Sequence, residues 1–198
     1  MKSPKHPLIG SLLALLAVAA LTALAPQERT LGENVRIVYL HGAWVLTAEA
    51  ALAASALAGL LGILTRRQRL HAWSAALARS GLCFWTSSLP LSLWAMQANW
   101  NGLFLAEPRF RIAVIFAVTG VLLQAGLALL SRPVLNSLFN VLFFGALTVA
   151  LRQANYVMHP PPSPIFGSGV PSIMFFFIAS ILLGLVSAGF LARAWLKE

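Results

Sequence analysis

Long apolar stretches interrupted by short polar segments set the pattern of this chain. Six stretches are apolar enough, or nearly long enough, to cross a bilayer, which takes about 20 residues in a helix. They cover residues 8–25, 38–64, 73–96, 110–130, 134–152 and 171–194. The pattern predicts an all-α polytopic membrane protein with six transmembrane helices and a single integral membrane domain over residues 1–198. A closed β-barrel is excluded, because these runs are too long and do not alternate.

Composition supports this class. Hydrophobic residues make up 59% and charged residues 10% of the 198 residues, whereas roughly 45–50% and 25% are typical of soluble domains. Asp is absent and Cys83 is the single cysteine, which excludes Asp-dependent triads, disulfides within the chain and Cys-rich metal sites. The net charge of +9 comes from residues that punctuate apolar runs, so the sequence predicts no nucleic-acid partner.

The distribution of Lys and Arg predicts that both termini are cytoplasmic. With the N-terminus inside, eight basic residues lie in inner segments and five in outer segments, and the TRRQR run at 65–69 contributes most to this difference. The inner residues are Lys2, Lys5, Arg66, Arg67, Arg69, Arg132, Arg193 and Lys197, and the outer ones are Arg29, Arg36, Arg109, Arg111 and Arg152. We expect the first stretch to be retained as a span. A cleaved signal peptide, the alternative, would leave Pro26 as the first mature residue.

Two histidines, His41 and His159, are predicted at the outer face. Neutral imidazole nitrogens can ligate a heme iron from both sides. Alternatively, each histidine is an interfacial residue bonded to water or a carbonyl, and spacing alone favours this second reading. Trp44, Trp100, Leu103 and Phe104 lie near the same face, where they predict either a shelf for a flat apolar cofactor or an aromatic belt.

Three segments carry a resemblance to a known family. They read RIVYLHGAWV at 36–45, WNGLFLAEPR at 100–109 and RQANYVMHPPPSPI at 152–165. In order and spacing they resemble the CcmC-type cytochrome c assembly proteins, which have six spans, a tryptophan-rich outer loop and two outer histidines. The resemblance covers roughly residues 30–195, and RIVYLH is its most specific part.

The resemblance implies a role for individual residues. His41 and His159 match the two axial ligands of a non-covalent b-type heme. Trp100, Glu107 and Arg109 match the Trp, Asp and Arg of the tryptophan-rich loop, with Glu in place of Asp. Leu103, Phe104 and Ala106 stand where the family has tryptophans. Either Arg109 or Arg111 is expected to pair with a heme propionate.

Glu49 is the most unusual residue of the second stretch. It follows His41 by eight positions, which places it about 12 Å deeper at 1.5 Å per residue. An ionisable group at that depth is costly and is a candidate for function. We expect an intramembrane pair between Glu49 and Arg79, or a protonated Glu49 bonded to a serine of the third stretch.

Two functions follow from these residues. The first is a heme-handling protein of the bacterial inner membrane that holds heme between His41 and His159 for c-type cytochrome maturation, with other maturation proteins as partners. The second is a divergent accessory subunit of a larger respiratory or photosynthetic membrane complex, with or without heme. The chain shows no nucleophile–base or carboxylate pair, so we predict that it is not an enzyme.

Overall fold

The computed structural model describes residues 5–158 and 165–196. His159, a predicted ligand, therefore lies outside the described residues. The described part forms six α-helices: α1 (Lys5–Leu24), α2 (Val35–Thr65), α3 (Gln68–Trp100), α4 (Pro108–Leu130), α5 (Pro133–Gln153) and α6 (Pro171–Trp195), with a short 3-10 turn at Phe166–Ser168 before α6. Each helix coincides with one predicted apolar stretch, so the prediction of an all-helical fold is confirmed.

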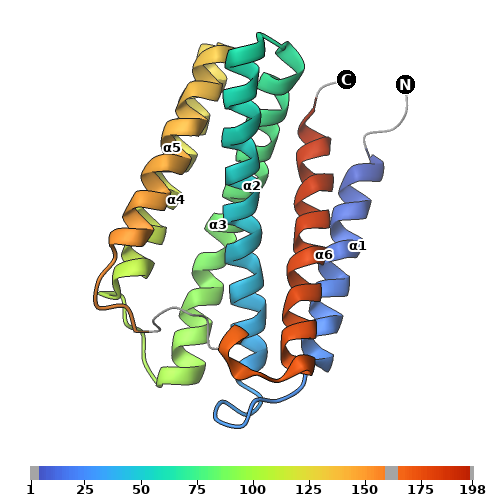
Figure 1. Cartoon of the computed structure of the whole chain (residues 1–198), viewed down its shortest axis with the longest axis vertical. Helices are drawn as coiled ribbons and strands as arrows, with labels where there is room; N and C mark the ends of the chain where they lie inside the picture. Colours follow the sequence, from blue (N-terminus) through green and yellow to red (C-terminus); the bar gives the residue numbers. More distant parts are fainter. Residues whose placement is uncertain (1–4, 159–164, 197–198) are drawn as a thin grey trace.

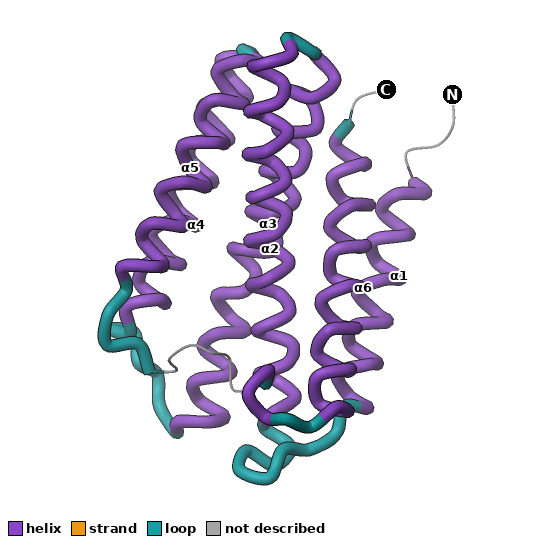
Figure 2. Tube along the Cα trace, in the orientation of Figure 1, coloured by secondary structure: helices purple, strands orange, loops and turns teal. Residues whose placement is uncertain are grey.

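Successive helices run antiparallel and pack in three layers (Figures 1 and 2). The α2–α3 pair forms the middle layer, the α1–α6 pair lies on one side of it, and the α4–α5 pair lies on the other. One end of the bundle, the termini end, carries the start of α1, the end of α6 and the turns at 66–67 and 131–132. The opposite end, the long-connection end, carries the segments 25–34, 101–107, 154–158 and 165–170.

Proline and left-handed residues set the helix boundaries. α4, α5 and α6 each begin at a proline, whose fixed φ and missing N–H suit the first helical position. α2, α3 and α4 each end at a residue with positive φ, namely Arg66, Asn101 and Ser131. These local signals turn the chain sharply and keep consecutive helices adjacent.

Among the described residues, five helices are long and apolar enough to cross a membrane, namely α1, α2, α4, α5 and α6. Large apolar side chains cover their outward faces, including Leu12, Leu57, Leu122, Leu142 and Leu182. Because soluble monomers rarely expose such continuous apolar surfaces, the exterior indicates a lipid bilayer as the environment. α3 does not reach the same apolar threshold, although it has 33 residues.

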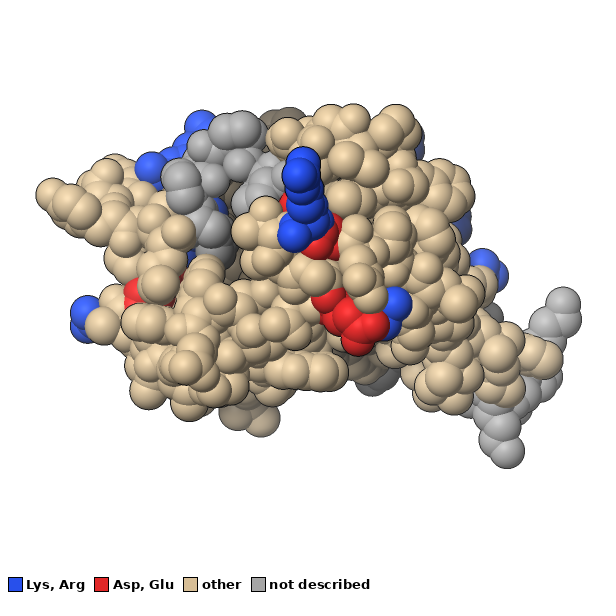
Figure 3. Space-filling view, turned by 90° about the horizontal axis from the view of Figure 1, so that it is seen from below, with Lys and Arg blue, Asp and Glu red and all other residues tan. Residues whose placement is uncertain are grey.

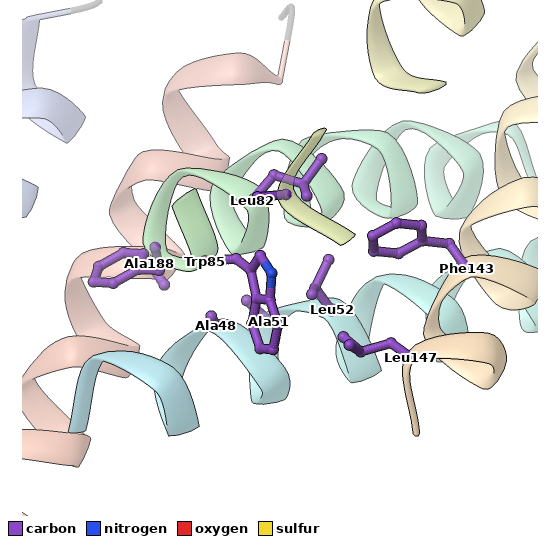
Figure 4. Packing of buried hydrophobic residues seen from close by; sticks show 10 residues of the cluster. Ala48, Ala51, Leu52, Leu82, Trp85, Phe143, Leu147 and Ala188 are labelled. Atoms are coloured by element: carbon purple, nitrogen blue, oxygen red, sulfur yellow. The ribbon is translucent and has the colours of Figure 1, made fainter. Parts of the chain in front are cut away.

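An apolar cluster holds the middle of the bundle together (Figure 4). Its side chains come from α2, α3, α5 and α6, with Ala117 from α4: Ala48, Ala51, Leu52, Leu82, Phe84, Trp85, Ala117, Phe143, Leu147 and Ala188. Trp85 also donates its indole N–H to the Ala113 carbonyl of α4 at 3.0 Å. A buried indole N–H needs such a partner, so this bond ties α3 to α4.

A cluster of buried polar side chains lies between this apolar cluster and the termini end. His71 Nδ1 lies 2.6 Å from Ser137 Oγ, and Ser55 Oγ donates to the Ser74 carbonyl at 2.7 Å. Asn140 donates to Ser74 Oγ and to Asn136 Oδ1, and accepts from Gln124 Nε2 at 2.7 Å. These residues come from α2, α3, α4 and α5, and we call them the polar cluster.

Two glycines of α2 make room for the polar cluster. A Cβ at Gly59 would lie 2.9 Å from the Ser137 carbonyl oxygen and 2.9 Å from Ser74 Oγ, and one at Gly62 would lie 3.0 Å from His71 Nδ1. The small residues of α2 therefore form a packing surface, as small residues often do between membrane helices. At Gly59 and Gly62, however, polar side chains occupy that surface.

Replacing Gly59 by alanine is expected to destabilise the protein. The added Cβ would press against the backbone oxygen of Ser137, which has little freedom to move. We expect a loss of about 1–3 kcal/mol, typical of overpacking, measured as a lower thermal unfolding temperature in detergent. Gly145→Ala is the matched control, because nothing lies within 4 Å of its Cβ position. Equal unfolding temperatures for Gly59→Ala and the parent would contradict the packing described here.

Candidate functional site

His41 lies on the second turn of α2, near the long-connection end, and is partly buried. Its Nδ1 is 3.4 Å from Ser92 Oγ on α3, and Ser92 Oγ also donates to the Ser88 carbonyl at 2.9 Å. A serine hydroxyl has one proton. Since that proton goes to Ser88, the contact suits the His41 tautomer that carries its proton on Nδ1 and donates it to Ser92. In the neutral ring the lone pair then lies on Nε2, the nitrogen that a metal would take.

Trp44 lies on the same face of α2, one turn after His41. Its indole N–H donates to Ser87 Oγ at 2.8 Å, and its ring lies 5.1 Å from that of Phe84. Both partners belong to α3. Trp44 therefore links α2 to α3 one helical turn after His41. This contact fixes the position of the helix segment that carries the histidine.

The α3–α4 connection carries the predicted aromatic residues. Trp100 is the last residue of α3, and its ring meets that of Phe104 at a centroid distance of 6.0 Å and an angle of 76°. Leu103 and Phe104 are 55% and 40% exposed. Together, Trp100, Leu103 and Phe104 give the long-connection end an apolar aromatic patch.

Glu107 begins α4 as its N-cap. Its Oε2 accepts from the Phe110 N–H at 2.6 Å, whereas its buried Oε1 accepts no hydrogen bond from the described residues. A carboxylate at a helix N-terminus satisfies free backbone N–H groups and the helix dipole. The capping geometry thus gives Glu107 a structural role at the start of α4, which the resemblance to the tryptophan-rich loop did not indicate.

Arg109 follows in the first turn of α4. Its Nε is buried and donates to no described residue. Arg109 is the cation whose electrostatic influence reaches Glu49 on α2, although no ion pair within 4.0 Å joins these two described residues. The buried Nε of Arg109 therefore has an N–H available for an anionic or carbonyl acceptor.

No ion pair within 4.0 Å joins the predicted partners Glu49 and Arg79 in the described residues. Among the described residues the only ion pair within 4.0 Å joins Arg36 and Glu33 at 3.9 Å. No serine of α3 donates to Glu49 either, in the part of the chain that the structure describes. Both Glu49 and Arg79 are partly buried, but the positive charge that interacts with Glu49 is that of Arg109.

Charged groups are sparse at the long-connection end, where most of the surface is uncharged (Figure 3). Two of its carboxylates are held locally in the 25–34 segment. Glu33 accepts from Gln27 at 2.8 Å, and Glu28 accepts from the N–H groups of Leu31 and Thr30. These backbone bonds stabilise the carboxylate and lower the pKa of Glu28 below its ordinary value.

The sequence analysis did not single out His71, which is buried and bonded to Ser137. A usable signal was present in the sequence. Gln124, Asn136 and Asn140 are polar residues inside apolar stretches, and the last two are four positions apart on one helix face. Such residues in a membrane helix face other helices by default.

No family model matches the chain, and neither a curated protein nor a solved structure matches it. The candidate residues are an imidazole in contact with Ser92, a partly buried arginine whose buried Nε donates to no described residue, and an exposed aromatic patch.

The interaction between Glu49 and Arg109 is testable by two double-mutant cycles. In the first, Glu49→Gln and Arg109→Gln are combined, and we expect a coupling of about 0.5–3 kcal/mol in the free energy of unfolding. In the second, Glu49→Gln is combined with Arg79→Gln as the matched control, and we expect no measurable coupling. If only the second cycle showed coupling, the partner of Glu49 would be Arg79 and not Arg109.

Proposed function

We propose that the protein handles heme at the long-connection end, with His41 as one axial ligand of the iron. The observation that carries this proposal is the 3.4 Å contact of His41 Nδ1 with Ser92 Oγ, whose own proton goes to the Ser88 carbonyl. Metal-ligating histidines nearly always donate their other ring N–H to a neighbouring acceptor, which fixes the ring and its tautomer. The proposed second ligand is His159, as the resemblance to CcmC-type proteins implies.

The remaining residues fit the other parts of heme. Arg109 has a buried Nε without an acceptor, which suits a propionate carboxylate. Trp100, Leu103 and Phe104 present apolar surface, which suits the porphyrin face. Heme supplies an iron that accepts imidazole nitrogens on both sides of the ring plane, and the chain supplies orientation, charge and shielding from water.

The proposed setting is a bacterial inner membrane crossed six times, with both termini in the cytoplasm. α3 is the sixth span, enclosed by more apolar helices. Under the positive-inside rule, the excess of basic residues at the termini end favours an inner position for that end. The long-connection end then faces outward, where c-type cytochromes mature. We propose that maturation proteins in the same membrane receive the heme.

The second candidate function is an accessory subunit of a larger membrane complex. One observation favours it: Leu103, Phe104 and Leu105 are 55%, 40% and 56% exposed. The first two replace family tryptophans. Apolar side chains exposed at a membrane surface suit contact with another membrane protein. In this alternative the scaffold is kept and heme is optional, and neither candidate includes catalysis.

Heme binding is tested by titrating purified protein with hemin and recording the Soret band. We expect a shifted band with the split visible bands of two-histidine ligation. His41→Ala is expected to remove it, and Ser92→Ala to weaken affinity by about 10–100-fold, the usual effect of losing a ligand's supporting bond. Arg109→Gln should reduce affinity less than His41→Ala.

His6→Ala is the matched control, because His6 is exposed at the termini end. It should bind hemin like the parent. An unchanged Soret band in His41→Ala would overturn the ligand assignment. No shifted band in the parent protein would leave the accessory-subunit function as the better account.

Orientation is tested by single cysteines in a Cys83→Ser background. Asn101→Cys and Ser131→Cys form a matched pair, since both residues are exposed and both end a helix with positive φ. An impermeant thiol reagent should label the first in intact cells, and the second only after the membrane is opened. The reverse labelling would invert the proposed topology.

A further inference from the structure

A small cavity lies between α2, α3, α4 and α5, where the polar cluster meets the apolar cluster. About 10 Å³ is available there to the centre of a water-sized sphere, which is about the minimum that holds one water molecule. The wall includes the apolar side chains of Leu52, Leu82 and Phe143. Its polar members are Ser55, Gln124 and Asn140.

Gln124 gives this cavity an unused acceptor. The residue is only 9% exposed, and its Oε1 is buried and accepts no hydrogen bond from the described residues. Its Nε2 donates to Asn140 Oδ1 at 2.7 Å. Exchanging the amide oxygen and nitrogen of Gln124 would bring two oxygens together at that distance, so Oε1 is the atom that lacks a partner.

The other two polar residues of the wall, Ser55 and Asn140, have no hydrogen-bond donor left for a ligand. Ser55 commits its only hydroxyl proton to the Ser74 carbonyl at 2.7 Å. Asn140 commits its two N–H groups to Ser74 Oγ and Asn136 Oδ1, at 3.0 and 2.9 Å. Ser55 Oγ and Asn140 Oδ1 each retain lone-pair capacity. These three side chains therefore offer the cavity acceptors, and a matching ligand must donate.

We propose that this cavity binds one water molecule, which donates to Gln124 Oε1 and to a second wall acceptor, Ser55 Oγ or Asn140 Oδ1. Water fits the volume and supplies two donors. A cation fits poorly, because three neutral oxygens among Leu and Phe side chains leave its buried charge without a counter-charge. Without a donor, Gln124 Oε1 would carry the cost of a buried unsatisfied acceptor.

The water would also connect helices that do not touch directly. α2 and α4 have no close Cα approach within the described residues, and they lie diagonally across the four-helix unit of α2–α5. Ser55 belongs to α2 and Gln124 to α4. A water that donates to Gln124 and Ser55 thus supplies a polar link across that diagonal, inside a bundle whose lipid surroundings offer no alternative partner.

The site is tested by radiolytic hydroxyl-radical labelling of the full chain in detergent, after exchange into ¹⁸O-water, with mass spectrometry of the products. Radicals form from water, so a buried side chain is labelled only where water lies beside it. We expect Phe143, which lines the cavity, to be labelled several-fold more than Phe177, which is buried in a separate apolar cluster. Equal labelling of the two rings would overturn the proposal.

Two variants sharpen the result. Gln124→Leu keeps the approximate size and removes the acceptor, so labelling of Phe143 should fall to the level of Phe177. Gln124→Glu retains acceptor oxygens and should label like the parent. Leu123→Met is the control for a change beside the cavity that leaves its polar groups intact. Undiminished labelling in a folded Gln124→Leu variant would contradict the proposal, and the comparison of the two rings in the parent requires no variant.

Discussion

Side-chain hydrogen bonds from α3 to its neighbours are the interaction on which this bundle depends. Ser80 donates to the Ala188 carbonyl of α6, and Trp85 to the Ala113 carbonyl of α4. Trp44 on α2 donates to Ser87, and Asn140 on α5 donates to Ser74. Because lipid offers no hydrogen-bond partner, each polar group inside a membrane bundle must be satisfied by protein or bound water. Accordingly α3, the most polar of the six helices, lies in the middle layer.

This arrangement divides the interior into regions of different character. The polar cluster lies toward the termini end, the apolar cluster around Leu52 and Trp85 fills the middle, and His41 with Ser92 lies toward the long-connection end. The histidine near the candidate site is thereby held by a rigid helix pair rather than by a loop. A ligand on a packed helix is positioned at little entropic cost, which suits recognition of a rigid group such as heme.

The charged residues of the interior also need partners within the protein, because lipid offers none. Glu49 and Arg109 interact across the diagonal between α2 and α4, and Gln124 lies on that diagonal nearer the termini end. Neither contact is between neighbouring helices in the layers. The Cα atoms of α2 and α4 stay apart, and Ala117 of α4 belongs to the same apolar cluster as Leu52 of α2. The diagonal therefore combines apolar packing with the polar groups of Glu49, Arg109 and Gln124.

Hydrophobic patterning alone determined where the helices lie, because an apolar run of bilayer length has few alternatives to a helix. Pro108, Pro133 and Pro171 marked the starts of three helices, since proline's fixed φ acts locally. The sequence also put His41 and Trp44 near the same membrane face. It did not reveal which helix their side chains meet, so Ser92 and Ser87 became partners only in the folded bundle.

Tertiary structure alone decided the interior contacts. Depth along the membrane made Arg79 a reasonable partner for Glu49, yet the direction of each side chain around its helix is set by packing, and Arg109 is the cation that interacts with Glu49. Likewise, only the packing of α3 and α5 brought Ser74, Ser137 and His71 against Gly59 and Gly62. The sequence of one helix specifies which residues share a face. A contact between two helices also depends on how each helix is rotated and tilted relative to the other.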